Sequence, residues 1–134
     1  MSENYSGENR RKFERIPVTF AVFYRVNSPL HIRMQVGDKE VDALAIDISE
    51  GGMALLTNYE IPASTIVTVK FIIVNDKAVS AAKRSRSINV QGEVRYSSLT
   101  NRKAYRLGVK FIDLSDDDRE FIGEFTKRFK SIMA

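Results

Sequence analysis

A repeated alternation of apolar and polar residues is the feature that most constrains this chain. A period of two places successive side chains on opposite faces of a β-strand, so each alternating stretch predicts a strand with one buried face. The stretches are bounded by turn-forming residues, and one of them follows the pair Gly51-Gly52. The apolar positions are Ile16, Val18, Phe20, Val22, Tyr24 and Val26; Leu44, Ile46 and Ile48; Met53 to Leu56; Val67, Val69, Phe71 and Ile73; Ile88, Val90, Val94 and Tyr96, with Gly92 on the same face; and Tyr105, Leu107, Val109 and Phe111.

The period changes near the C-terminus, where the apolar residues recur with the spacing of one helical stripe. Ser115 is a natural N-cap, and the run 116–118 places three aspartates at the positive end of the helix dipole. This helix-start chemistry accounts for the three carboxylates better than a metal or acid/base site does. The pattern predicts a helix over about 116–132 that buries one face against the strands. Its stripe is Phe121, Ile122, Phe125, Phe129, Ile132 and Met133.

Length and charge describe an ordinary small domain. The 134 residues suit one hydrophobic core, and 43% hydrophobic with 28% charged residues is a globular composition. We interpret residues 1–9 as a flexible lead and residues 10–134 as a single domain, with strands over about 16–113. The formal net charge of +4 favours an anionic partner but does not choose one.

Several classes of function lack the residues that they need. The chain has no cysteine, which excludes disulfides and thiolate catalysis, and His31 is its only histidine. Its apolar neighbours make His31 look like a loop or strand-edge residue. No glycine-rich phosphate loop is present, so we expect neither an enzyme nor a bound cofactor. No apolar run is long enough to cross a membrane, and the basic residues at 10–15 precede too short an apolar run for a signal peptide, so the expected location is cytoplasmic.

Two short motifs carry the functional signal. Arg11 and Arg15 are spaced i, i+4 ahead of the first predicted strand, and Asp47, Ser49 and the two glycines form the sequence DISEGG at a predicted hairpin. Each motif alone has an ordinary explanation: solvated charges in the first case, and a tight turn in the second. Both motifs in this order, within this strand pattern, are more specific.

Together they resemble the PilZ domain, a family of bacterial receptors for cyclic di-GMP. The resemblance extends to GEVRY at 92–96, to YRLGVKFIDLS at 105–115 and to the closing helix. It implies a six- to seven-stranded antiparallel β-barrel with a C-terminal helix packed on it. It also implies that Arg10, Arg11, Arg15, Asp47, Ser49, Gly51 and Gly52 bind cyclic di-GMP, and that the signal passes to a separate effector protein.

The residue types suit such a ligand. A planar guanidinium can form two parallel hydrogen bonds to the Hoogsteen edge of guanine or stack on its ring, as expected for Arg11 and Arg15. Asp47 can accept hydrogen bonds from guanine N–H groups, and the Ser49 hydroxyl can bind the base or a phosphate. A side chain at Gly52 could block the ligand or strain the turn.

Arg10 bears on the number of ligands. In the family that the chain resembles, an arginine directly before the motif is associated with a stacked, intercalated ligand dimer. The resemblance therefore implies two ligands per protein, with Arg10 contacting the second. The alternative is that Arg10 is one more solvated charge.

Two other functions are compatible with the sequence. A small basic barrel can bind single-stranded nucleic acid through stacked aromatic residues, although most aromatic residues here occupy predicted core positions, and nucleic acid is not the expected partner. A PilZ-like barrel can also act purely through protein contacts, with no nucleotide. Nothing in the sequence selects among motility, pilus function, exopolysaccharide synthesis and secretion as the regulated process.

Overall fold

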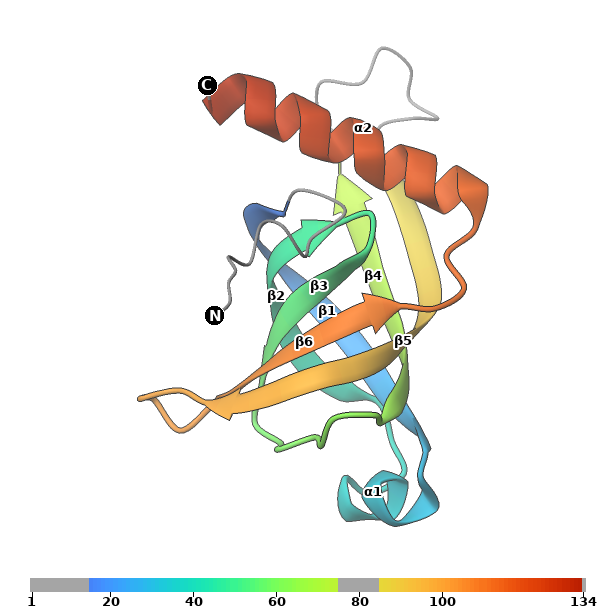
Figure 1. The fold of residues 1–134 in the computed structure, drawn as a ribbon, viewed down its shortest axis with the longest axis vertical. Coiled ribbons are helices and arrows are strands. Elements are labelled where there is room, and N and C mark those ends of the chain that lie inside the picture. The colour runs from blue at the N-terminus through green and yellow to red at the C-terminus, as the bar shows by residue number, and fades with distance from the viewer. Residues whose placement is uncertain (1–14, 75–84, 134) are drawn as a thin grey trace, which may run out of the picture.

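A closed antiparallel β-barrel forms the body of the computed structural model, which describes residues 15–74 and 85–133. The six strands of these residues confirm the predicted barrel, and the predicted C-terminal helix is also present (Figure 1). In chain order the elements are β1 (Ile16–Ser28), α1 (Leu30–Gln35), β2 (Val41–Ser49), β3 (Gly52–Thr57), β4 (Ile66–Val74), β5 (Ser85–Leu99), β6 (Tyr105–Phe111) and α2 (Asp116–Met133).

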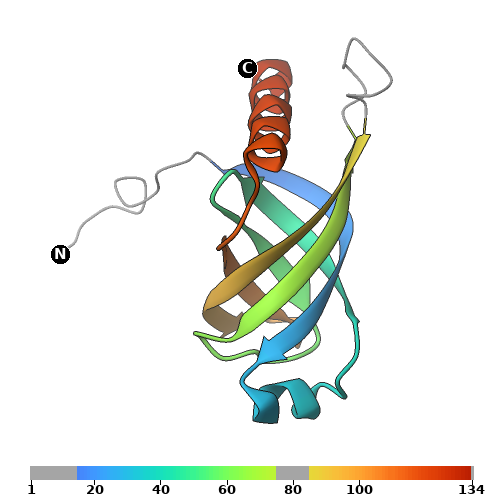
Figure 2. The ribbon, with the colours of Figure 1, turned by 90° about the vertical axis from the view of Figure 1, so that its right-hand side faces the viewer.

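The strands follow one another around the barrel in the order β1-β2-β3-β6-β5-β4, and β1 pairs with β4 to close it. All of the pairings are antiparallel. Figure 2 and Figure 1 both place α2 across one end of the barrel and α1 at the other end. The loop between β2 and β3 lies at the α2 end, so the DISEGG turn sits below the helix.

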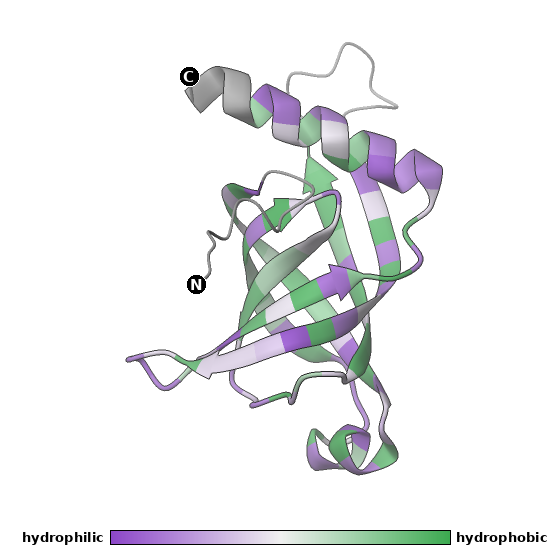
Figure 3. Cartoon of the chain, viewed as in Figure 1, coloured by the Kyte–Doolittle hydropathy of each residue, from purple (hydrophilic) through white to green (hydrophobic). Residues whose placement is uncertain are grey.

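The inward-facing positions form one continuous core. The predicted alternation is confirmed in β1 and β4, whose buried residues include Val22, Tyr24, Val69 and Phe71. Buried and more exposed positions alternate along these strands, and the end of β4 is hydrophobic throughout (Figure 3). Near the α2 end the core is aromatic: the ring centroids of Phe20 and Phe71 lie 5.7 Å apart, and those of Phe71 and Phe111 lie 6.4 Å apart.

The start of α2 has the predicted cap, because the Ser115 Oγ accepts a hydrogen bond from the Asp118 backbone N–H at 3.1 Å. Asp118 also binds Arg86 of β5 at 2.6 Å, which ties the helix to the barrel. Phe121 and Ile122 are buried as predicted. The predicted stripe positions Ile132 and Met133 lie beyond the described side chains.

Gly123 has a packing role that the sequence did not reveal. A Cβ at this position would lie 3.0 Å from the Glu50 carboxylate, which belongs to the turn between β2 and β3. The absence of a side chain therefore lets α2 approach that turn closely. This contact offsets part of the cost of about 1 kcal/mol that glycine carries in a helix.

Two predicted faces were wrong, and a β-bulge is the cause in each case. In β2, Ala45 is buried and Leu44 is exposed, because the β2–β3 register shifts between Ala45 and Asp47 before Ile48 turns inward again. In β5, the register shifts between Val94 and Tyr96, and the Tyr96 side chain faces outward. An extra residue in one strand reverses every side chain beyond it, and the apolar period does not reveal where this happens.

His31 also lies elsewhere than expected. It is an exposed residue of the helix α1 rather than a loop or strand-edge residue. The six residues of α1 are too few to show a helical period, and the helix has no side-chain N-cap.

Candidate functional site

Asp47 is the centre of a polar cluster on the outer wall of the barrel. The bulge in β2 directs its carboxylate outward, where the side chain is 15% exposed. Its Oδ1 accepts hydrogen bonds from Arg15 Nη1 at 2.7 Å and from the Ala54 backbone N–H at 3.1 Å. Its Oδ2 accepts one from Arg106 Nη2 at 3.3 Å. The carboxylate therefore has three donors from three different segments.

Arg15 reaches this carboxylate because of the β1–β2 register. It immediately precedes β1, and the next two residues, Ile16 and Pro17, are opposite Ile48 and Asp47. The two sequence motifs, separated by about thirty residues of chain, thus meet at one ion pair. With side chains 22% and 15% exposed, the pair is open enough to solvent for its attraction to be modest, on the order of 1 kcal/mol or less.

The other motif residues build the turn from β2 to β3. The Ser49 Oγ accepts a hydrogen bond from the Gly51 backbone N–H at 3.1 Å, and Ser49 is only 2% exposed. The Gly51 carbonyl in turn accepts one from the Phe111 N–H at 2.9 Å. Ser49 and Gly51 therefore hold the turn against the end of β6.

Gly52 is required by the fold itself. A Cβ at this position would lie 2.1 Å from the backbone carbonyl oxygen of Val109 in β6. The sequence suggested that a side chain here could block a ligand or strain the turn. The described contact is instead the close approach of β3 to β6.

Two residues of the cluster were not identified from the sequence as site residues. Arg106 of β6 binds Asp47 and also donates from Nε to the Tyr96 hydroxyl at 3.3 Å. The hydrogen bond to Tyr96 raises the pKa of Arg106, and the nearby Asp47 acts in the same direction. The Tyr96 ring lies over Gly108, where a Cβ would be 2.0 Å from the ring.

These residues form one row across four strands. Asp47 of β2 is opposite Ala54 of β3, Ala54 is opposite Gly108 of β6, and Gly108 is opposite Tyr96 of β5. Only the pairing of β3 with β6 brings Arg106 and Tyr96 beside Asp47. Both residues occur in segments that carried the family resemblance, but sequence spacing does not show strand order.

Arg10 and Arg11, the remaining predicted site residues, lie outside the described residues.

The arrangement is suited to bind a planar, polar, anionic molecule. It offers guanidinium groups, one carboxylate that can exchange its donors, and an aromatic ring that is 42% exposed. Within residues 15–74 and 85–133, no group of His, Asp and Glu side chains is placed to hold a metal ion. No helix of that same part of the chain is long and apolar enough to cross a membrane.

Comparisons with known proteins agree with this geometry. The family model described as PilZ domain matches residues 9–128. A search of curated protein sequences gives no match.

The same fold occurs in solved structures at low sequence identity. The inhibitor of motility MotI/DgrA of Bacillus subtilis superposes with a TM-score of 0.70 and 15% identity, over 92% of this chain and 52% of that one. The PilZ domain of YcgR from Escherichia coli, solved with c-di-GMP, gives 0.58 and 14%, over 92% and 97%. A tetrameric PilZ protein of Xanthomonas campestris gives 0.59 and 12%, over 91% and 90%. This chain therefore spans about half the length of MotI/DgrA and almost all of the YcgR PilZ domain.

Proposed function

Since this chain belongs to the PilZ domain family, we propose that it is a receptor for cyclic di-GMP that regulates a separate protein. The observation that carries the proposal is the ion pair at 2.7 Å between Arg15 and Asp47, because it unites the two motifs of the family at one exposed place. The YcgR PilZ domain, which shares the fold, was solved with c-di-GMP.

When the ligand binds, the Asp47 carboxylate exchanges its hydrogen-bond donors. The guanine N1–H and N2–H groups donate to the carboxylate, and Arg15 turns from Asp47 to the Hoogsteen edge of the base or to its ring face. Giving up the Arg15–Asp47 pair costs little, because both groups are partly exposed. New hydrogen bonds to charged groups contribute about 1.5–3 kcal/mol each, so a few of them support a dissociation constant near micromolar.

The remaining site residues have distinct roles in this proposal. Arg11 joins Arg15 in clamping the ligand, while Ser49 and Gly51 maintain the turn and Gly52 keeps β3 close to β6. Arg106 and Tyr96 extend the site beyond the motifs by offering a second guanidinium and a ring. Because Arg10, Arg11 and Arg15 share one short segment, we infer that the lead folds over the bound ligand and that this change is the signal passed to the effector.

Titration calorimetry with cyclic di-GMP tests the proposal. Arg15→Ala should weaken binding by at least tenfold, because it removes one charged contact. The matched control is Arg25→Ala, since Arg25 is an arginine of β1 that likewise forms an ion pair, but with Asp38 beside α1, away from Asp47. Binding of GTP with equal affinity, or equal effects of the two variants, would refute the assignment. No binding at tens of micromolar folded protein would leave the protein-contact alternative.

The stoichiometry tests Arg10 separately. We expect two molecules of cyclic di-GMP per chain, and one in Arg10→Leu, because Arg10 is proposed to contact the second ligand of a stacked pair. Saturation of the unmodified chain at one equivalent would show that Arg10 is a solvated charge.

Salt dependence tests the nucleic-acid alternative, because the binding of a nucleic-acid strand would weaken steeply between low and moderate salt.

A further inference from the structure

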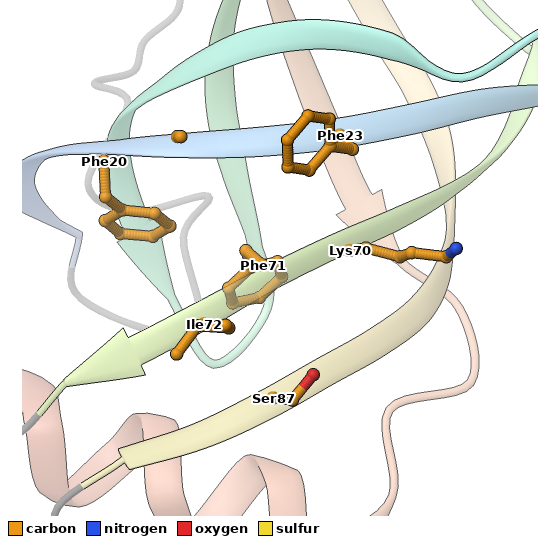
Figure 4. A pocket seen from close by; sticks show the side chains of 7 residues that line it. Phe20, Phe23, Lys70, Phe71, Ile72 and Ser87 are labelled. Carbon is orange, nitrogen blue, oxygen red and sulfur yellow. The ribbon is translucent and has the colours of Figure 1, made fainter.

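The pairing of β1 with β4 that closes the barrel covers only part of the length of these two strands. Their ladder pairs Phe23 with Lys70 and continues from there toward Ser28 and Ile66. On the other side of Phe23 and Lys70 the two strands diverge, and in the described residues no backbone pairing joins 16–22 to 71–74. We call this opening the β1–β4 wedge. Figure 4 shows the rings of Phe20 and Phe71 lying in it.

A pocket of about 360 Å³ occupies the wedge. Its walls are mainly apolar, formed by Phe20, Ala21, Phe23, Phe71 and Ile72, and Lys70 and Ser87 lie at its border (Figure 4). The volume is at the lower end of the range for ligand pockets and is enough for a large side chain. The pocket lies against the aromatic contact of Phe20 with Phe71, so its floor is the barrel core itself.

The outward surface of the two strand segments at the wedge is mainly apolar. Phe23, Ile72 and Val74 are 42%, 59% and 54% exposed. The other outward positions of these strand segments are small or uncharged, and Lys70 is the one charged residue among them; its ammonium already binds Glu40 at 2.8 Å. Exposed apolar residues that gather beside a strand edge mark an interaction surface.

We propose that the β1–β4 wedge binds an extended segment of a partner protein, which adds as a strand to the free edge of β4 and places one large apolar side chain in the pocket. Backbone geometry selects an extended occupant: a strand edge offers alternating N–H and C=O groups, and only an extended chain presents the matching series. A helix uses its backbone groups internally. The mainly apolar walls, whose one charged lining residue Lys70 already binds Glu40, select a segment whose central residues are uncharged. The inference does not depend on cyclic di-GMP.

A second copy of this chain fits the wedge less well. At 71–74 its own β4 is paired with β5 on one side, so it would bring that sheet with it. That β4 therefore cannot enter the narrow space between two diverging strands as an isolated strand can.

Selection from a displayed library of random linear twelve-residue peptides provides the probe. The full chain serves as bait, and one selected peptide is synthesised and titrated against variants by fluorescence anisotropy. Ile72→Lys should weaken binding by at least tenfold, because it places a charge at the pocket wall. The matched control, Leu30→Lys, changes a similarly exposed apolar residue of α1 at the opposite end and should alter affinity by less than twofold. Cyclic di-GMP should not displace the peptide competitively.

N-methylation along the peptide then distinguishes strand addition from simple burial of side chains. Methyl groups on alternate amides should abolish binding, whereas those on the intervening amides, which point away from β4, should be tolerated. Equal tolerance at all positions would overturn the proposal. It would also be overturned if no selected peptide responds to Ile72→Lys, or if sedimentation shows a dimer that Ile72→Lys dissociates, which would assign the wedge to a second copy.

Discussion

Around Asp47 the strands β2, β3, β6 and β5 are paired continuously, whereas the β1–β4 ladder stops at Phe23 and Lys70. The first side carries charged residues that are linked by hydrogen bonds, and glycines there permit close backbone contact. The second side exposes apolar residues beside a free edge. A barrel can therefore hold a precise polar site where its strands stay paired, with β-bulges turning the site residues outward, and keep an adaptable surface where the ladder opens.

The largest expected effect on stability comes from adding a side chain where β3 and β6 approach each other closely. Gly52→Ala places a Cβ 2.1 Å from the Val109 carbonyl oxygen, so β3 and β6 must separate. We expect the free energy of unfolding to fall by about 3 kcal/mol or more in urea denaturation. In the control, Gly108→Ala, the new atom meets only the exposed Tyr96 ring, which can rotate away. A loss of similar size in both variants would contradict the backbone explanation.

Removing the central carboxylate should have the next largest effect on stability. Asp47→Ala deprives the Ala54 N–H and two arginines of their acceptor. The buried N–H accounts for most of the cost, about 1–3 kcal/mol, while the arginines can turn to water. Asp38→Ala is a useful comparison, because Asp38 also binds two arginines but its side chain is 39% exposed. If the two variants are equally stable, the Asp47 cluster contributes nothing beyond surface ion pairs.

Tyr24 tests how well the barrel core excludes water. This residue of β1 follows Phe23, donates or accepts a hydrogen bond with Thr57 at 2.8 Å, and is 1% exposed. Burial raises the pKa of Tyr24 to about 12 from its ordinary value of 10.0. The folded chain thus keeps a proton that the unfolded chain loses. The resulting stabilisation is complete below pH 10 and is lost as the pH rises toward 12.

Urea denaturation at pH 9 and pH 11 measures this effect. The unmodified chain should lose about 1.3 kcal/mol more between these two pH values than Tyr24→Phe does. Tyr24→Phe also leaves the Thr57 hydroxyl without its hydrogen-bond partner. That cost is the same at both pH values, so it cancels when the loss of unfolding free energy between pH 9 and pH 11 is compared. An equal loss in both proteins would mean that water reaches the Tyr24 hydroxyl.

The smallest effect is expected at the wedge surface. Ile72→Lys should change the free energy of unfolding by less than about 0.5 kcal/mol, because the side chain is 59% exposed and no tight contact depends on it. Phe71→Ala, one residue earlier but buried in the aromatic contact, should cost about 3–5 kcal/mol. A marked loss in Ile72→Lys would show that Ile72 belongs to the core rather than to a binding surface.

Sequence alone determined much of this protein. The turn at Gly51-Gly52 marks the start of β3, the two-residue period marks the other strands of the described residues and the buried faces of β1 and β4, and the helical stripe and Ser115 mark the start of α2. These features are local, because the chain periodicity and the cap chemistry act over a few residues. The motif residues Arg15, Asp47 and Ser49 were likewise recognisable by their order in the chain.

Tertiary structure decided the rest, because it depends on which strands become neighbours and in what register. The bulges that turn the side chains of Leu44 and Tyr96 outward are properties of the strand pairing. The apolar period of the sequence does not reveal them. Arg106 joins Asp47 only because β6 lies beside β3 in the barrel, although β4 and β5 separate these two strands in the chain. The β1–β4 wedge exists because the barrel closes over part of its length, and closure is a property of all six strands together.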